Sequence, residues 1–155
     1  MLRRDFGSRV FAHYEDITML YSLAYLSLLA AIVLAYWPRS IAAREMAKLP
    51  GGYNNHEPRE QQTRLDGLGR RALAAHLNGL EAIPVFGLGV LAALQRSVDT
   101  RWVAALCVLF VAARVLYVLA YLRDRATLRS MMFLLGAMAC LVLICFAAFS
   151  GRAGS

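Results

Sequence analysis

The chain has few charged residues for its length. Of its 155 residues only 17% are Asp, Glu, Lys or Arg, against about 25% in a soluble domain. Hydrophobic residues make up 59% and the mean hydropathy is +0.51, which argues against an ordinary soluble fold. The formal net charge is +7. In so apolar a chain we expect the surplus positive charge to lie in loops beside lipid headgroups, and we expect no nucleic-acid partner.

Cysteine is also scarce, and its spacing excludes familiar chemistry. Cys107, Cys140 and Cys145 all fall in apolar stretches, with no CxxC pair and no Cys/His spacing of a metal site. We interpret them as small packing residues and predict no metal. The sequence also lacks a glycine-rich phosphate loop, a Ser/His/Asp arrangement and paired carboxylates, so hydrolase and nucleotide chemistry find no support.

What the sequence has instead is long uncharged stretches. Four stretches carry at most one charged residue each and match the roughly 20 residues that cross a bilayer: approximately 17–38, 72–95, 102–122 and 130–151. The first is too long for the apolar core of a signal peptide, which has about 7–15 residues, so we expect it to be retained. The sequence thus predicts one all-α domain over residues 1–155, an integral membrane four-helix bundle.

The connections between the spans concentrate arginine but do not orient the chain. Residues 39–71 and 123–129 follow the first and third spans, so they lie on one side of the membrane and hold ten Lys and Arg residues. The opposite side holds six in fewer residues, so the densities are nearly equal. The positive-inside rule therefore gives no orientation, although the three arginines of 123–129 favour a cytoplasmic position there.

Two spans carry one ionisable residue each at the same depth. Glu81 lies roughly 15 Å from the Arg71 end of its span, and Arg114 lies roughly 13–14 Å from the Arg123 end of the next span, at 1.5 Å per residue. Because charges inside a bilayer are expensive, we expect the two side chains to form an ion pair. That pair is either purely structural or part of a functional site. His76 points to another side of its helix and is interpreted as a packing or an interfacial residue.

Further polar residues lie shallower on the same helix faces. Asn78 precedes Glu81 by three residues, while Tyr117 and Tyr121 follow Arg114 on one stripe. Continuing toward the loop, Arg125 and Arg129 would stand at the mouth of a polar cavity whose floor is the charge pair. Such a cavity suits a small anionic ligand that meets a lipophilic one. Taken singly, each tyrosine is equally explained as an aromatic residue at the membrane interface.

These segments resemble the family of membrane-associated proteins in eicosanoid and glutathione metabolism, which includes microsomal glutathione transferase and leukotriene C4 synthase. The second span, 75–86, reads AHLNGLEAIPVF and is similar to the family's Asn-x-x-Glu followed by Pro and Phe. The third, 114–121, reads RVLYVLAY and is similar to its Arg-x-x-Tyr-x-x-x-Tyr, with Arg129 opening the next helix. The loop 53–59, YNNHEPR, resembles that of the bacterial branch.

The resemblance implies a function and an assembly. It implies a homotrimer in the bacterial inner membrane, with both termini non-cytoplasmic, that uses glutathione as cosubstrate against lipophilic electrophiles, as a transferase or a peroxidase. Glutathione would bind between subunits near the cytoplasmic face, at residues that match family contacts: Arg44, Asn78, Glu81, Tyr117 and Tyr121. Arg129 matches the arginine that holds the glutathione thiol as a thiolate. Because the 123–129 connection varies in length among relatives, Arg125 is the alternative.

The chain departs from the family at two positions. Relatives that bind glutathione firmly carry arginine four residues before the Asn, and some carry one directly before it; here these positions are Ala74 and Leu77. Arg71, one turn earlier, is a candidate replacement. The alternative function is a non-catalytic membrane protein that binds a lipid or a partner, as some members of the family do. A small transporter gains little support, because there are four spans and no pair of broken helices.

Overall fold

The computed structural model describes the backbone of residues 2–150 and the side chains of Glu15 and residues 17–150. Within this part the chain forms five helices: α1 (Leu2–Ala47), α2 (Pro58–Thr63), α3 (Gly67–Gln95), α4 (Thr100–Leu122) and α5 (Ala126–Phe149). Four of them, all but the short α2, are long and apolar enough to cross a membrane. The predicted all-α membrane four-helix bundle is confirmed.

The helices are longer than the apolar stretches that predict them. In α1 the helix continues on both sides of residues 17–38. α3 begins at Gly67 and α5 at Ala126, ahead of residues 72 and 130. At the other end α5 stops at Phe149, and residue 151 lies outside the described residues. Hydropathy therefore marks where lipid surrounds a helix, while turns and caps mark where the helix ends.

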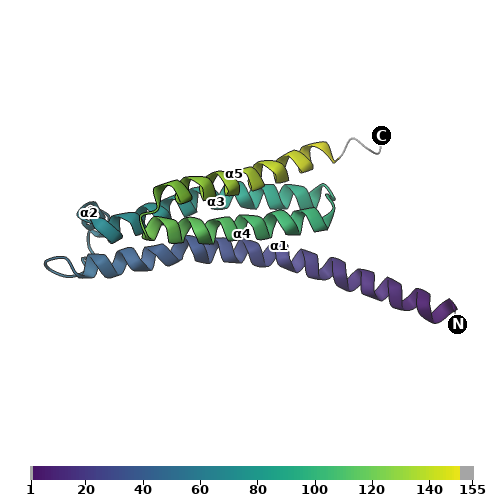
Figure 1. Cartoon of the computed structure of the whole chain (residues 1–155). Helices are drawn as coiled ribbons and strands as arrows, with labels where there is room; N and C mark the ends of the chain where they lie inside the picture. Colours follow the sequence, from purple (N-terminus) through teal and green to yellow (C-terminus); the bar gives the residue numbers. More distant parts are fainter. Residues whose placement is uncertain (1, 151–155) are drawn as a thin grey trace.

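The four long helices lie side by side, as Figure 1 shows. α1 packs against α3 and α4, and α5 packs against the same two helices. The α1–α3 connection with α2 lies at the same end of the bundle as the α4–α5 turn, whereas the α3–α4 connection, the start of α1 and the end of α5 lie at the opposite end (Figure 1). The arginine-rich connections 39–71 and 123–129 therefore gather at one end.

Small residues let the helices approach closely. A Cβ atom added to Gly79 of α3 would lie 2.8 Å from the Cβ of Ala35 on α1, so only glycine fits there. Beside this contact, His76 Nδ1 donates a hydrogen bond of 2.9 Å to the carbonyl oxygen of Ala35. Close packing of this kind, with polar side chains bonding across it, is typical of helix association in membranes. His76 is thus a packing residue.

The long connection is held by one buried glutamine. Gln61 of α2 donates from Nε2 to the carbonyl oxygen of Gly52 at 2.6 Å and to that of Met46 at 3.3 Å, and its Oε1 accepts from the Asn54 backbone N–H at 2.9 Å. Gln61 is 6% exposed, so these bonds satisfy an amide that would otherwise be costly to bury. They fold residues 52–61 against the end of α1.

Candidate functional site

A hydrogen-bonded chain of three polar side chains joins α3 to α4. Arg114 Nη1 donates to Asn78 Oδ1 at 3.0 Å, and Asn78 Nδ2 donates to Glu81 Oε2 at 3.3 Å. No ion pair within 4.0 Å joins Glu81 to Arg114 among the ion pairs of the described residues. The predicted direct pair is therefore wrong. The amide of Asn78 lies between the two charges, because it offers an acceptor to the guanidinium and a donor to the carboxylate.

Arg114 is buried with spare hydrogen-bonding capacity. The residue is only 5% exposed, and its guanidinium carbon lies 4.2 Å from the centre of the Tyr117 ring. Within the described part of the chain, Nη2 of Arg114 has no hydrogen-bond partner. An unsatisfied buried donor on a charged group is costly, so an acceptor oxygen from a ligand or water is expected there.

Arg114 lines a cavity of about 180 Å³. Its polar lining consists of Asn78, Glu81 and Arg114, and its apolar lining includes Val85, Phe110 and Phe133. The lining therefore comes from α3, α4 and α5 and combines a charged edge with an apolar wall. That combination can hold a ligand with a polar end and a lipophilic end.

The tyrosines carry the chain of contacts on to α5. The rings of Tyr117 and Tyr121 lie 5.4 Å apart at an angle of 70°, and the guanidinium carbon of Arg129 lies 4.7 Å from the centre of the Tyr121 ring. A cation over an aromatic face is attracted by the ring's quadrupole. The structure thus brings six of the sequence-predicted residues into one continuous series of contacts: Glu81, Asn78, Arg114, Tyr117, Tyr121 and Arg129.

The structure does not bring Arg44 or Arg125 into this series. Arg44 is exposed in the last turn of α1, and no described contact links it to the other site residues. Arg125 stands at the N-cap of α5 and lines a separate cavity at the α4–α5 turn. Arg71 is engaged elsewhere too, because its Nη1 lies 3.6 Å from Asp124 Oδ2. Of the two candidate arginines near the start of α5, only Arg129 contacts a tyrosine of the series.

Glu81 is exposed in the single chain although it lies at mid-span. It shares its exposed face of α3 with Leu77, which is 51% exposed, and with Val85 and Leu88. A carboxylate that faces hydrocarbon is strongly unfavourable, so the exposed position of Glu81 is costly for the single chain in a bilayer. The sequence predicts how far along its span Glu81 lies, but it could not show that the residue is exposed on the surface of the single chain.

These features define a four-span α-helical membrane protein with a polar series of side chains inside its bilayer region. A sequence model of the family of membrane-associated proteins in eicosanoid and glutathione metabolism (MAPEG) matches residues 22–149. This range includes every site residue from Arg44 to Arg129. The chain belongs to the MAPEG family. A comparison with curated proteins gives no match. The family resemblance of the two motif-bearing spans is confirmed.

Proposed function

We propose that the protein is a glutathione-dependent transferase or peroxidase that acts on lipophilic electrophiles dissolved in the bilayer. The observation that carries the proposal is the continuous series of contacts from Glu81 to Arg129, which crosses three helices and leaves Arg114 Nη2 without a hydrogen-bond partner among the described residues. Ionisable groups at membrane depth raise the free energy of the folded protein, so they are usually kept for a function. Binding of a polar, anionic tripeptide beside an apolar cavity is such a function.

Each residue has a definite task in this proposal. Asn78, Glu81, Tyr117 and Tyr121 hold the tripeptide, since their side chains offer donors and acceptors along one line. Arg114 keeps α3 and α4 joined through Asn78 and offers Nη2 to an acceptor oxygen. Arg129 supplies the cation that lowers the pKa of the bound thiol, and the thiolate is the nucleophile toward the electrophile.

The proposal extends to the assembly. A homotrimer would cover the exposed face of Glu81, and Arg44 would then contact glutathione across a subunit boundary, which accounts for its isolation within one chain. We place the arginine-rich end of the bundle in the cytoplasm of a bacterium, with both termini on the outer side of the inner membrane. Membership of the MAPEG family and the arginines of 123–129 support this proposed orientation.

Conjugation of glutathione to a chlorodinitrobenzene-type electrophile tests the proposal. Purified protein in detergent is compared with Arg129→Ala and, as a matched control, Arg125→Ala. We expect Arg129→Ala to lower kcat/KM at neutral pH by at least about tenfold, because each unit of thiol pKa above the assay pH lowers the thiolate fraction tenfold. Arg125→Ala should stay within about twofold. If only Arg125→Ala loses activity, the role passes to Arg125; if the wild-type protein does not conjugate at all, the transferase proposal fails.

A second function is favoured by Ala74 and Leu77. Both stand where glutathione-binding relatives carry arginine, and Arg71 pairs with Asp124 instead of replacing them. In this reading the protein binds a lipid or a partner without catalysis, and the polar series is structural. Calorimetric titration separates the two functions. No heat of glutathione binding at millimolar concentration, together with retained binding of a fatty acid, favours the non-catalytic protein.

A further inference from the structure

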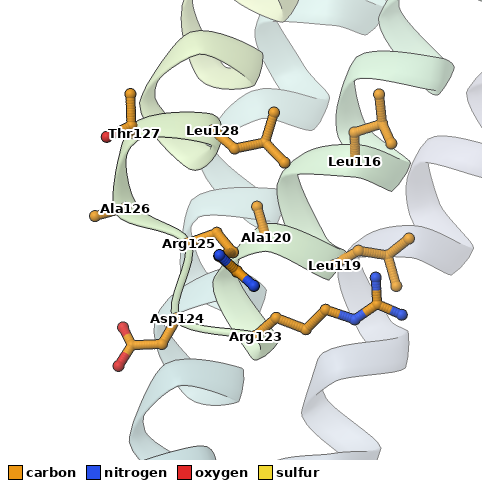
Figure 2. Close-up of a pocket in the computed structure, with 9 residues that line it drawn as sticks. All are labelled: Leu116, Leu119, Ala120, Arg123, Asp124, Arg125, Ala126, Thr127 and Leu128. Atoms are coloured by element: carbon orange, nitrogen blue, oxygen red, sulfur yellow. The ribbon is translucent and has the colours of Figure 1, made fainter.

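A second, larger cavity of about 600 Å³ lies at the α4–α5 turn. Figure 2 shows its lining, with Leu116 and Leu119 on α4, Leu128 on α5, and Arg123 and Arg125 on either side of the turn. Leu116 is 45% exposed and Leu128 is 41% exposed, so the apolar wall is open to the surroundings. The cavity therefore has a basic part at the end of the bundle and an apolar part that leads into the bilayer.

This cavity is separate from the polar series described above. Its lining from α4 includes Leu119, which follows Tyr117 by two residues and so points to roughly the opposite side of a helix with 3.6 residues per turn. Neither Tyr117 nor Tyr121 lines it, and nor does Arg129. A ligand in this cavity would leave the proposed glutathione site free.

The cavity carries an uncompensated positive charge. Its one carboxylate, that of Asp124, points away from Arg123 and Arg125 in Figure 2 and lies 3.6 Å from Arg71 on α3. Among the described residues no hydrogen bond or ion pair engages the guanidinium of Arg123 or of Arg125. The first turn of α5 adds no acidic residue and has no side-chain cap, so its free N–H groups strengthen the positive potential.

We propose that this cavity binds the phosphate headgroup of an anionic phospholipid, with an acyl chain along Leu116 and Leu128. Two free guanidiniums match a negatively charged phosphodiester in charge and in hydrogen-bond geometry. Basic pockets between membrane helices at a cytoplasmic face hold such headgroups. A free phosphate would leave the leucines without a partner, whereas the lipid occupies both parts of the cavity.

Native mass spectrometry of the full chain in non-ionic detergent tests this site with two probes, phosphatidylglycerol and phosphatidylcholine. The variant R123Q/R125Q removes the two cavity arginines. The matched control R59Q/R70Q removes two exposed arginines from the same end of the bundle, outside the cavity. We expect phosphatidylglycerol to bind the wild-type protein and the control alike, and to bind R123Q/R125Q at least about tenfold more weakly. Phosphatidylcholine should bind all three weakly.

Other results overturn the proposal in distinct ways. Equal losses in the two double variants mean that general surface charge, not the cavity, attracts the lipid. Equal retention of the two lipids by the wild-type protein removes the charge preference. If inorganic phosphate at millimolar concentration displaces the lipid headgroup and Leu116→Ser leaves binding unchanged, the site is one for free phosphate. Thermal unfolding checks that each variant is folded. We expect Tm values close to that of the wild type for the two double variants, because all four arginines are exposed.

Discussion

Arg114 Nη1 donates a hydrogen bond of 3.0 Å to Asn78 Oδ1, which ties together two helices through residues 36 positions apart. The same two helices also share an apolar contact, in which Phe86 stacks on Phe110 with 3.8 Å between ring centres. Apolar packing alone leaves the register of two helices loosely defined, because leucine-like surfaces and lipid tails are similarly apolar. The polar bond sets one register, and the same register aligns Tyr117 with the Asn78 and Glu81 level.

Replacing Asn78 by leucine should therefore lower the free energy of unfolding more than removing an ordinary polar residue from the surface does. We expect Asn78→Leu to lower the free energy of unfolding in mixed micelles by about 2–3 kcal/mol, because a buried guanidinium loses its hydrogen-bond acceptor. Arg114→Met should cost much less in the Asn78→Leu background than in the wild type. A double-mutant cycle between Glu81→Gln and Arg114→Met should give a smaller coupling energy than the cycle between Asn78→Leu and Arg114→Met. A larger coupling for Glu81 would restore the direct ion pair.

The residues of this site differ in how far the sequence could place them. Helical spacing is a local property, so the stripes of Asn78 with Glu81 and of Tyr117 with Tyr121 could be predicted. Which polar atom lies between Glu81 and Arg114 depends on the rotation of two helices about their axes, and the sequence does not encode that rotation in any short pattern. Arg44 could be placed on α1 only, because its contacts would depend on another chain.

The contact between Gly79 and Ala35 offers a test of the packing with an internal control. Gly79→Ala places a methyl group 2.8 Å from the Ala35 Cβ and 2.9 Å from its Cα, so the helix backbones must separate. We expect a loss of about 1–3 kcal/mol from overpacking. Gly87→Ala in the same helix meets only Leu28 Cδ2, at 3.9 Å, and should be neutral or stabilise by up to about 1 kcal/mol. Equal shifts in Tm for the two variants would contradict the close approach of α1 and α3.

The ends of the elements were harder to predict than their existence. The existence of the four spans could be predicted from their apolar length, because a stretch of about 20 residues with at most one charge is long and apolar enough to cross a bilayer. The short helix α2 escaped prediction since Gln61 stabilises it through Gly52 and Met46, residues distant in sequence. The α4–α5 turn likewise depends on a residue of another helix, because Asp124 in the turn pairs with Arg71 of α3. Asp124 has a φ of +58°, in the left-handed region.

The stacking of Arg129 on Tyr121 gives a prediction about activity. Tyr121→Leu removes the ring face under the guanidinium, and Tyr121→Phe keeps it. If the ring positions the cation that stabilises the thiolate, Tyr121→Leu should lower kcat/KM for glutathione conjugation by about 3- to 30-fold, the equivalent of roughly 0.5–2 kcal/mol. Tyr121→Phe should lower it less. Identical losses in both variants would assign the effect to the hydroxyl group and not to the ring. The thiol pKa, read from the pH profile of each variant, should rise only in Tyr121→Leu.

At the opposite end of the bundle, Asp99 caps α4 and makes its stability depend on pH. The Asp99 carboxylate accepts hydrogen bonds from the Arg101 side chain at 2.8 Å and from its backbone N–H at 2.9 Å, and these lower the pKa of Asp99 below its usual 3.8. With the folded pKa lowered, the unfolded chain binds more protons, so the stabilisation is present above about pH 4 and disappears as the pH falls through the folded value. Thermal unfolding in a non-ionic detergent should therefore show a lower Tm for Asp99→Asn than for wild type at pH 7 and a smaller difference at pH 3.

Asp66→Asn is the control, because Asp66 stands at the N-cap of α3 without a side-chain capping bond. A Tm difference for Asp99→Asn that stays constant between pH 7 and pH 3 would show that the capping bond does not depend on the charge of the carboxylate.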